Sequence, residues 1–130
     1  MLDTDICIYL AKDQYPQVTA RFERLKPEQL VMSAITYGEL QNGANKSSQR
    51  SRTLSQLAEL IQYIPVESLA SSAAQAYGEI RAALERQGSM IGNYDLWIAA
   101  HAMAMNVTLA TNNDREFLRV TGLSVENWTK

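Results

Sequence analysis

The chain is poor in cysteine, histidine and long hydrophobic runs, and each shortage excludes a class of protein. Its 130 residues include one cysteine, Cys7, and one histidine, His101. A single cysteine excludes an internal disulfide and a multi-cysteine zinc site, and it suits a reducing cytoplasm. A single histidine excludes a two-histidine metal site on one chain. The apolar runs are far shorter than a membrane span and no signal peptide is recognisable, so we expect a cytoplasmic protein.

An excess of positive charge is also lacking. The chain has 12 Lys and Arg residues against 14 Asp and Glu residues, which gives a formal net charge of −2. Attraction of the whole molecule to nucleic acid is therefore excluded, and a polyanion would need a local basic patch. With 46% hydrophobic and 20% charged residues the composition is that of a folded globular protein, and the length predicts a single domain over residues 1–130.

Short apolar segments alternate along the chain with longer helical patterns. This alternation predicts right-handed βαβ crossovers and an α/β fold of three layers, with a central, mostly parallel sheet and helices on both faces. The helix after Ser33 is expected to lose regularity near Asn42 and Gly43, and Gly88 is expected to end a later helix. The expected strands are residues 1–2, 30–32, 64–66, 107–110 and 123–125.

Four acidic residues follow the expected strands. Asp3 follows the first strand, Glu39 lies in the helix after the second, Asp95 begins an alanine-rich helix, and Asp114 follows the strand near Thr111. Because the working crevice of such a sheet lies outside the carboxyl ends of its strands, we expect these acids to converge. Clustered carboxylates must hold protons or a cation, and carboxylates without histidine or thiolate favour Mg²⁺ or Mn²⁺. Mg²⁺ in turn points to phosphate-ester chemistry.

Each acid also has a local explanation. Asp3 and Asp5 could cap the first helix, and Glu39 stands at capping-box spacing from Thr36. Asp95 would favour the dipole of its helix, and the fourth acid could be a turn residue. Only their shared position at one sheet edge favours a joint role.

The two residues with other reactive side chains are expected to be structural. His101 is six residues after Asp95, which is roughly 240° around a helix, so it should point away from the acids and serve in packing. Cys7 stands between Ile6 and Ile8 and is expected to be a small core residue.

Several motifs occur in order along the chain and resemble one known family. They are Leu2-Asp3-Thr4-Asp5, Glu39 in the helix after Met32-Ser33-Ala34-Ile35-Thr36, Gly92-Asn93-Tyr94-Asp95-Leu96-Trp97-Ile98-Ala99, and Thr111-Asn112-Asn113-Asp114-Arg115-Glu116-Phe117. Together they resemble the PIN-domain ribonucleases, specifically the VapC-type toxins of type II toxin–antitoxin systems. The resemblance extends over the whole chain. Relatives often have a few more residues before the first strand, which here has only two residues, so a longer natural N-terminus remains open.

The resemblance implies an endoribonuclease that depends on Mg²⁺ or Mn²⁺, leaves 5′-phosphate and 3′-hydroxyl ends, forms a homodimer and is blocked by a VapB-type antitoxin. By position, Asp3 and Asp95 would be the principal metal ligands, Glu39 would bind metal or orient water, and Asp114 would be the fourth acid. At the fourth position, the places of Asn113 and Asp114, members of the family carry either acidic or neutral residues. Many relatives carry asparagine at the place of a further acid, Asp5, so this residue could be a ligand or a helix cap.

Relatives that share the Gly88-Ser89-Met90-Ile91-Gly92 loop cut initiator tRNA in its anticodon stem-loop, which makes that RNA the favoured substrate. Four basic residues are candidates for holding the RNA, although ordinary solvated helix faces would explain them equally well: Lys46, Arg50, Arg52 and Arg86.

Two other functions remain open from the residues. A receiver-like phosphoacceptor domain would need a lysine after a late strand, and Lys130 is the only lysine after Leu109. A non-catalytic partner-binding module would have the same grooves without activity.

Overall fold

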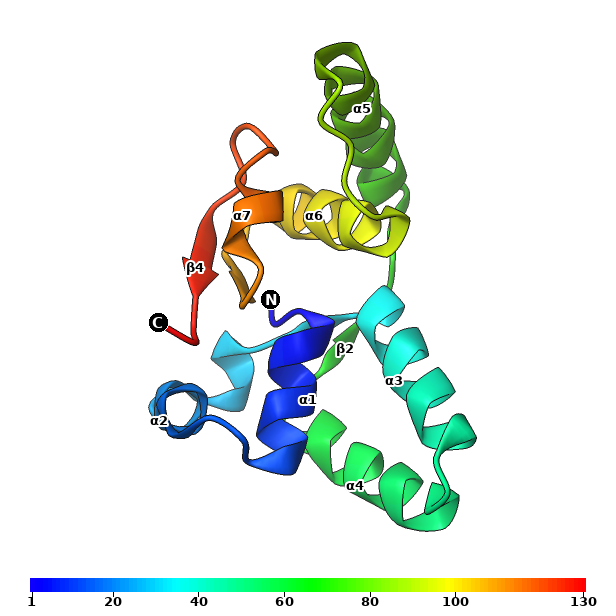
Figure 1. Cartoon of the computed structure of the whole chain (residues 1–130), viewed down its shortest axis with the longest axis vertical. Coiled ribbons are helices and arrows are strands. Elements are labelled where there is room, and N and C mark those ends of the chain that lie inside the picture. Colours follow the sequence, from blue (N-terminus) through cyan, green and yellow to red (C-terminus); the bar gives the residue numbers. More distant parts are fainter.

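The computed structural model describes residues 1–130 and has seven α-helices. Figure 1 shows how these helices lie around short strands. None of the helices is both long enough and apolar enough to cross a membrane. The elements in chain order are α1 (Thr4–Lys12), α2 (Pro16–Glu23), the 3-10 helix η1 (Pro27–Gln29), β1 (Met32–Ser33), α3 (Ala34–Lys46), α4 (Arg50–Tyr63), β2 (Val66–Glu67), α5 (Ser71–Gln87), α6 (Asn93–Met105), β3 (Leu109–Thr111), α7 (Asp114–Phe117) and β4 (Val125–Asn127).

The N-terminal residues join two parallel two-stranded ladders, β1–β2 and β3–β4. On one side the Leu2 N–H donates to the Val31 carbonyl at 2.9 Å. On the other side Leu2 bridges Ala110 in parallel, the Ala110 N–H donates to the Met1 carbonyl at 2.8 Å, and the Asp3 N–H donates to the Ala110 carbonyl at 3.0 Å. The order is therefore β2, β1, residues 1–3, β3, β4, and Asp3 stands at the carboxyl end of the central segment.

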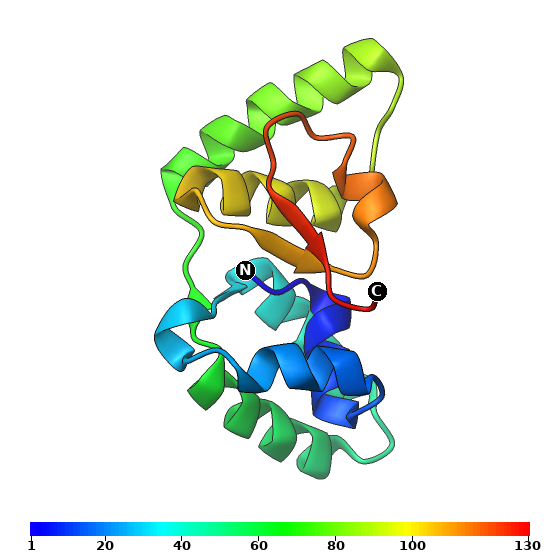
Figure 2. The same ribbon diagram turned by 90° about the vertical axis from the view of Figure 1, so that its left-hand side faces the viewer.

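Helices cover both faces of this sheet, as predicted for an α/β fold of three layers (Figure 2). Helices α5 and α6 pack on one face, and α1, α2 and α4 pack on the other. Side chains alternate between the faces as strand geometry requires: Met1 and Leu109 join the core under α5 and α6, whereas Leu2 and Ala110 join the core under α1 and α2.

Local signals set several helix ends where the sequence predicts them. Asp3 caps α1, and Pro16 occupies the first turn of α2, where its missing N–H is not needed. Gly88 ends α5 with φ of 65°, a left-handed conformation that glycine adopts without steric cost.

Several local predictions were wrong, and the strands expected at 30–32 and 107–110 lie at Met32–Ser33 and Leu109–Thr111. Helix α3 continues through Asn42 and Gly43 to Lys46, because Ala44 packs into the molecule and burial outweighs the weak helix propensity of glycine. The strand predicted at 64–66 lies at Val66–Glu67. Ile64 instead ends α4, because its N–H donates to the Leu60 carbonyl. The last strand begins at Val125, two residues later than predicted, and the one-turn helix α7 was not predicted.

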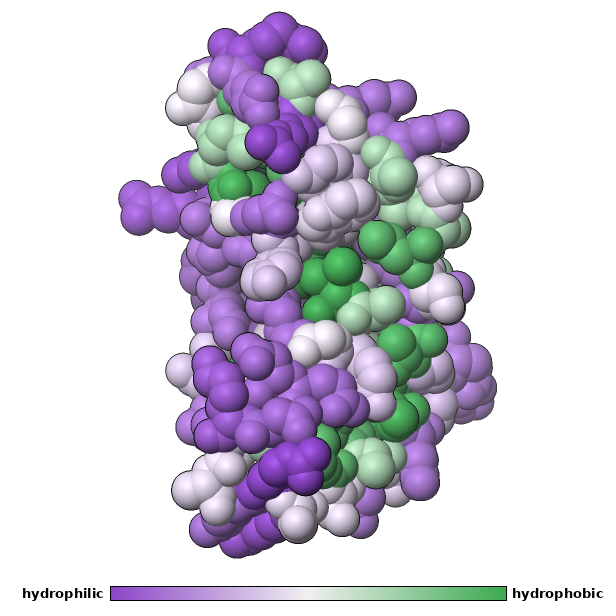
Figure 3. All heavy atoms as spheres, turned by 90° about the vertical axis from the view of Figure 1, so that its right-hand side faces the viewer, coloured by the Kyte–Doolittle hydropathy of each residue, from purple (hydrophilic) through white to green (hydrophobic).

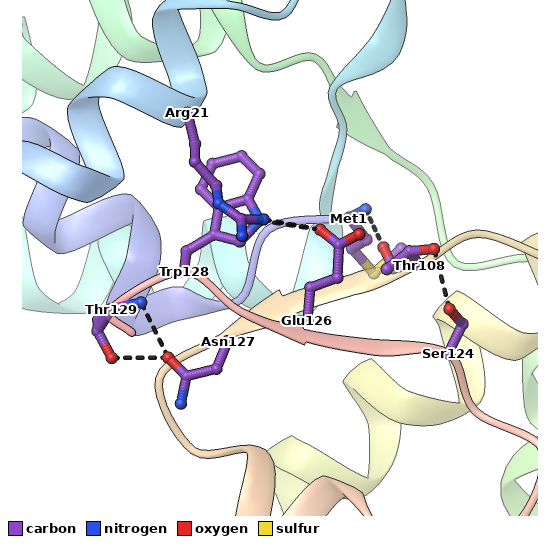
Figure 4. A network of polar contacts seen from close by, with 8 residues as sticks. All are labelled: Met1, Arg21, Thr108, Ser124, Glu126, Asn127, Trp128 and Thr129. Carbon is purple, nitrogen blue, oxygen red and sulfur yellow. Dashed lines mark hydrogen bonds and ion pairs between the residues drawn. The ribbon is translucent and has the colours of Figure 1, made fainter.

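The two ends of the chain are tied to the sheet by polar contacts (Figure 4). Arg21 of α2 forms an ion pair with Glu126 at 3.2 Å, and the Trp128 indole N–H donates to the same carboxylate at 3.2 Å. The Met1 ammonium donates to the Thr108 carbonyl at 2.7 Å, and burial lowers the pKa of this ammonium group. These contacts tie β4 to α2 and the N-terminus to the residue that precedes β3.

Candidate acidic site

Asp3 is a buried carboxylate at the centre of the sheet edge. Only 4% of its surface is exposed. One carboxylate oxygen accepts the Ile6 N–H at 3.0 Å, and the other accepts the Thr111 hydroxyl. Burial raises the pKa of Asp3 to about 6; the nearby charges of Asp5 and Glu39 raise it further, while the two hydrogen bonds lower it. Asp3 therefore caps α1 and also carries a charge that its surroundings disfavour.

Glu39 faces α1 and takes no part in a capping box. The Thr4 hydroxyl donates to Glu39 Oε1 at 2.7 Å, across from one helix to the other. The cap of α3 is Ser33, which accepts the Ile35 N–H at 3.1 Å, and Thr36 is buried within the first turn. The local explanation of Glu39 is thus wrong, and its side chain is turned toward the residues that follow the central segment.

Asp95 lies in the first turn of α6 beside Glu116 of α7. The Asn113 amide donates to Glu116 Oε2 at 2.9 Å. Burial first, then interaction with the Glu116 carboxyl group, then the charges of Asp3 and Glu39 raise the pKa of Asp95 to about 7. Asp95 therefore lies within electrostatic reach of Asp3, which precedes α1, of Glu39 in α3 and of Glu116 in α7.

Asp114 lies outside this group. Its pKa is lowered, first by a hydrogen bond from the Asn127 side chain and then by Lys130, whose ammonium is 3.5 Å from the carboxylate. In a helical turn, residues two apart point about 200° apart, so only one of Asp114 and Glu116 can face Asp95. The structure turns Glu116 inward because Phe117 is fully buried and anchors α7. The sequence analysis missed Glu116, and without the position of α7 no sequence signal distinguishes the two acids.

His101 and Cys7 have the structural roles predicted for them. The buried His101 ring contacts the Ser33 hydroxyl at 2.8 Å, which ties the start of α3 to α6, and burial lowers the pKa of the ring. Cys7 is fully buried, and burial raises the pKa of its thiol. Neither residue adds a ligand to the acidic group.

The four basic candidates are divided between the two ends of the molecule. Lys46, Arg50 and Arg52 flank the α3–α4 turn, whereas Arg86 lies in the last turn of α5, at the far end of Figure 1. All four are exposed. Two of them are engaged with neighbouring amides: Arg50 donates to Asn45 at 2.8 Å and Arg52 to Gln49 at 3.3 Å. The structure therefore does not gather these residues into a single basic patch.

Comparison with known proteins assigns the family. The sequence family described as the PIN domain matches residues 1–123 of this chain. Ribonuclease VapC2 of Rickettsia felis is 39% identical over 131 residues, which cover 100% of this chain and 98% of the relative. The chain belongs to the PIN-domain family of VapC ribonucleases.

Two further relatives extend the VapC comparison. The tRNA(fMet)-specific endonuclease VapC of Shigella flexneri is 40% identical over 129 residues, covering 99% of this VapC-family chain and 97% of the relative. The crystal structure of DNA-bound VapBC from Salmonella typhimurium contains a chain that superimposes with a TM-score of 0.93 at 38% identity, covering 98% and 96% of the two chains. The PIN fold predicted from the sequence is confirmed, and the receiver-like alternative is set aside.

The acids of this VapC-family chain fit a hard divalent cation by their chemistry. The donors are carboxylates alone, which suits Mg²⁺ or Mn²⁺, and burial with mutual repulsion favours an added positive charge. No three acidic, histidine or cysteine side chains are gathered at metal-binding distances. Each acid instead holds a polar neighbour, as in the bonds of Thr111 to Asp3, Thr4 to Glu39 and Asn113 to Glu116. Ion binding would exchange some of these contacts for metal ligation.

The raised pKa of Asp95 predicts how the stability of the metal-free protein depends on pH. A carboxyl group whose pKa rises from 3.8 to about 7 on folding binds more protons in the folded state, so its stabilising effect is present below about pH 4 and is lost as the pH rises through 7. Asp95→Asn should therefore stabilise the metal-free protein at pH 8. Because Asp95 is half exposed, solvent screening limits the gain to about 1 kcal/mol, or about 4 °C in Tm.

Differential scanning calorimetry in EDTA checks this expectation at two pH values. The gain from Asp95→Asn should shrink at pH 4, where the wild-type carboxyl is protonated. A gain of equal size at both pH values would show that charge repulsion is not its cause.

Proposed function

We propose that this chain is an endoribonuclease toxin that works with Mg²⁺ or Mn²⁺ held by Asp3, Glu39, Asp95 and Glu116. The observation that carries the proposal is the buried Asp3 carboxylate at the carboxyl end of the central segment, whose charge acts together with those of Glu39 and Glu116 on Asp95. In this assignment Glu116 takes the place that the sequence analysis gave to Asp114. A single PIN domain over residues 1–130, in the cytoplasm, carries the activity.

The chain holds the ligands in place before RNA arrives. The Thr111 hydroxyl and the Ile6 N–H fix both oxygens of Asp3, and the Thr4 hydroxyl fixes one oxygen of Glu39. When bound, a divalent ion supplies Lewis-acid chemistry: it lowers the pKa of water and offsets negative charge on a phosphodiester. The carboxylates of Asp95 and Glu116 would orient the attacking water once the ion has drawn the acids together, and a fixed orientation of this kind lowers the barrier.

Initiator tRNA, cut in its anticodon stem-loop, is the proposed substrate. Two relatives with about 40% identity carry the name tRNA(fMet)-specific endonuclease, from Shigella flexneri and Salmonella typhimurium. A loop with splayed bases also gives a protein access to single phosphodiesters, which a duplex does not. The loop from Gly88 to Gly92 supports the site in this chain, because buried Ile91 anchors the segment that leads into the first turn of α6.

A VapB-type antitoxin is the proposed inhibitor, and a second copy of the chain is the proposed partner. An apolar groove of about 290 Å³ between α1, α3 and α4 is lined by Ile8, Leu40 and Leu57, and Glu39 stands at its edge. An apolar segment in this groove would be well placed to bring a cation to the acids. Figure 3 shows hydrophobic residues gathered across the middle of one face, and such a patch is typical of a protein interface.

Incubation of the purified protein with initiator tRNA, in Mg²⁺, Mn²⁺ or EDTA, tests the proposal. Cleavage at one or two sites is expected with either ion, EDTA should abolish it, and sequencing of the new 5′ ends should place the cuts in the anticodon stem-loop. An elongator tRNA of equal length serves as the matched substrate. No cleavage under any condition would favour the non-catalytic binding module, whereas equal cleavage of all RNAs would remove the tRNA assignment alone.

A further inference from the structure

A second cavity opens beside Glu39 and shares Ile8 and Glu39 with the apolar groove. It is open to solvent and has a volume of about 630 Å³ between α1, α3 and the first turn of α6, which lies within the range of ligand clefts, about 300–1,000 Å³. Its wall includes Asp5, Gly38, Glu39, Asn42 and Tyr94. The cavity therefore borders the acidic site and offers space into which a nucleotide flanking a cut phosphate could extend.

The charge of this cavity decides which part of a nucleotide can enter. No lysine or arginine lines it, while Asp5 and Glu39 do. A phosphate group would be repelled by these carboxylates, whereas an uncharged base would not. The amide of Asn42 and the carboxylate of Asp5 can accept hydrogen bonds, and the exocyclic amino groups of cytosine, adenine and guanine are the donors that would match them.

Tyr94 supplies an aromatic surface on the cavity wall. It is next to Asp95 in the chain, and 61% of its surface is exposed, so its ring is not needed by the core. An exposed aromatic ring beside a nuclease site is the usual platform for an unpaired base, because every base can stack on it.

Gly38 keeps the cavity open from the side of α3. It lies inside a helix, where glycine is less favourable than alanine, and its backbone has no left-handed conformation that would require glycine. A Cβ added at this position would meet no atom within 4 Å. A larger side chain at this position would therefore extend into the cavity without disturbing the fold.

We propose that this cavity is a nucleobase subsite, in which the base adjoining the cut phosphate stacks on Tyr94 and presents an amino group to Asp5 or Asn42. The inference rests on the proposed function, since the acids must cut RNA for the base to be held. Beyond RNA cleavage itself, it assigns to this chain a preference for one nucleotide whose base carries an exocyclic amino group.

Tyr94→Leu combined with abasic substitution tests the stacking. On an anticodon stem-loop oligonucleotide, Tyr94→Leu should lower kcat/KM about 10-fold, and removal of the one base that stacks should lower wild-type kcat/KM by a similar factor. In the Tyr94→Leu enzyme the same abasic change should lower kcat/KM very little further, because the base has no aromatic ring left to stack on. Tyr63→Leu is the matched control, because Tyr63 is 55% exposed on α4, away from the acids.

Substitution of the same nucleotide by uridine tests the amino-group preference, and a several-fold loss of kcat/KM is expected for the wild type. Multiplicative losses from Tyr94→Leu and every abasic position would overturn the subsite, as would unchanged cleavage by Tyr94→Leu. Absence of cleavage by the wild type in Mg²⁺ would instead contradict the proposed function itself.

Gly38→Leu provides an independent test, because it fills the cavity without changing a polar group. Cleavage should fall at least 10-fold while the melting temperature stays the same or rises. Gly78→Leu, at an exposed helix position that is equally open, should leave cleavage unchanged. Equal activity of Gly38→Leu and the wild type would show that no part of the substrate enters the cavity.

Discussion

Asp3→Asn is expected to lower RNA cleavage by about 10³-fold and to leave the fold intact. Asparagine has nearly the same shape and is as good a helix cap as aspartate, so α1 keeps its first hydrogen bond. The substitution removes the charge of a carboxylate whose pKa burial raises to about 6, and it replaces the oxygen that accepts the Thr111 hydroxyl with an NH2 group. Loss of the buried charge offsets loss of this hydrogen bond, so the melting temperature should change little while activity disappears.

The matched control for this prediction is Asp13→Asn, at the other end of the same helix. Asp13 has φ of 50°, a conformation that asparagine tolerates well, and its side chain accepts the Thr19 hydroxyl at 2.9 Å. Cleavage should be unchanged in this variant. Equal loss in both variants would mean that Asp3 acts through the stability of α1, and full activity of Asp3→Asn would remove it from the site.

Glu116→Gln and Asp114→Asn are expected to separate by about 100-fold in cleavage rate, because they lie on opposite sides of α7. Glu116 acts on Asp95 and helps to raise its pKa, so the loss of its charge should reduce kcat at saturating RNA by about 100-fold. Asp114 pairs with Lys130 near the surface, and such exposed pairs contribute little to stability. Its substitution should change activity less than about threefold.

The comparison is decisive because the two acids are two residues apart in one helical turn. Single-turnover rates on one tRNA substrate, measured at several Mg²⁺ concentrations, separate a loss of ion affinity from a loss of chemistry. A large loss in Asp114→Asn with a small loss in Glu116→Gln would restore the assignment made from the sequence and contradict the arrangement of α7.

The sequence predicts best where a residue's position depends on its own strand or helix. Asp3 directly follows the central strand and Asp95 begins a buried helix, so their place at the sheet edge follows from the order of elements alone. The layers follow for the same reason, since the alternation of strands and helices leaves few topologies open.

Prediction fails where the partner comes from a distant segment. The contact of Glu39 with Thr4 joins α3 to α1, so the local capping-box spacing with Thr36 was misleading. The choice of Glu116 over Asp114 depends on how buried Phe117 anchors a four-residue helix, which is too short to show a periodic pattern. Strand ends shifted for a related reason, because strands of two or three residues are set by neighbouring hydrogen bonds.

The most direct test of the account is the anomalous scattering of crystals soaked in Mn²⁺. We expect a peak within ligand distance, about 2.0–2.2 Å, of carboxylate oxygens from Asp3 and at least one of Asp95 and Glu116, and no peak at Asp114. The same soak of Asp3→Asn crystals should show a weaker peak or none. A strong Mn²⁺ peak elsewhere on the protein, with the four acids unoccupied and their mutual contacts unchanged, would contradict the central claim.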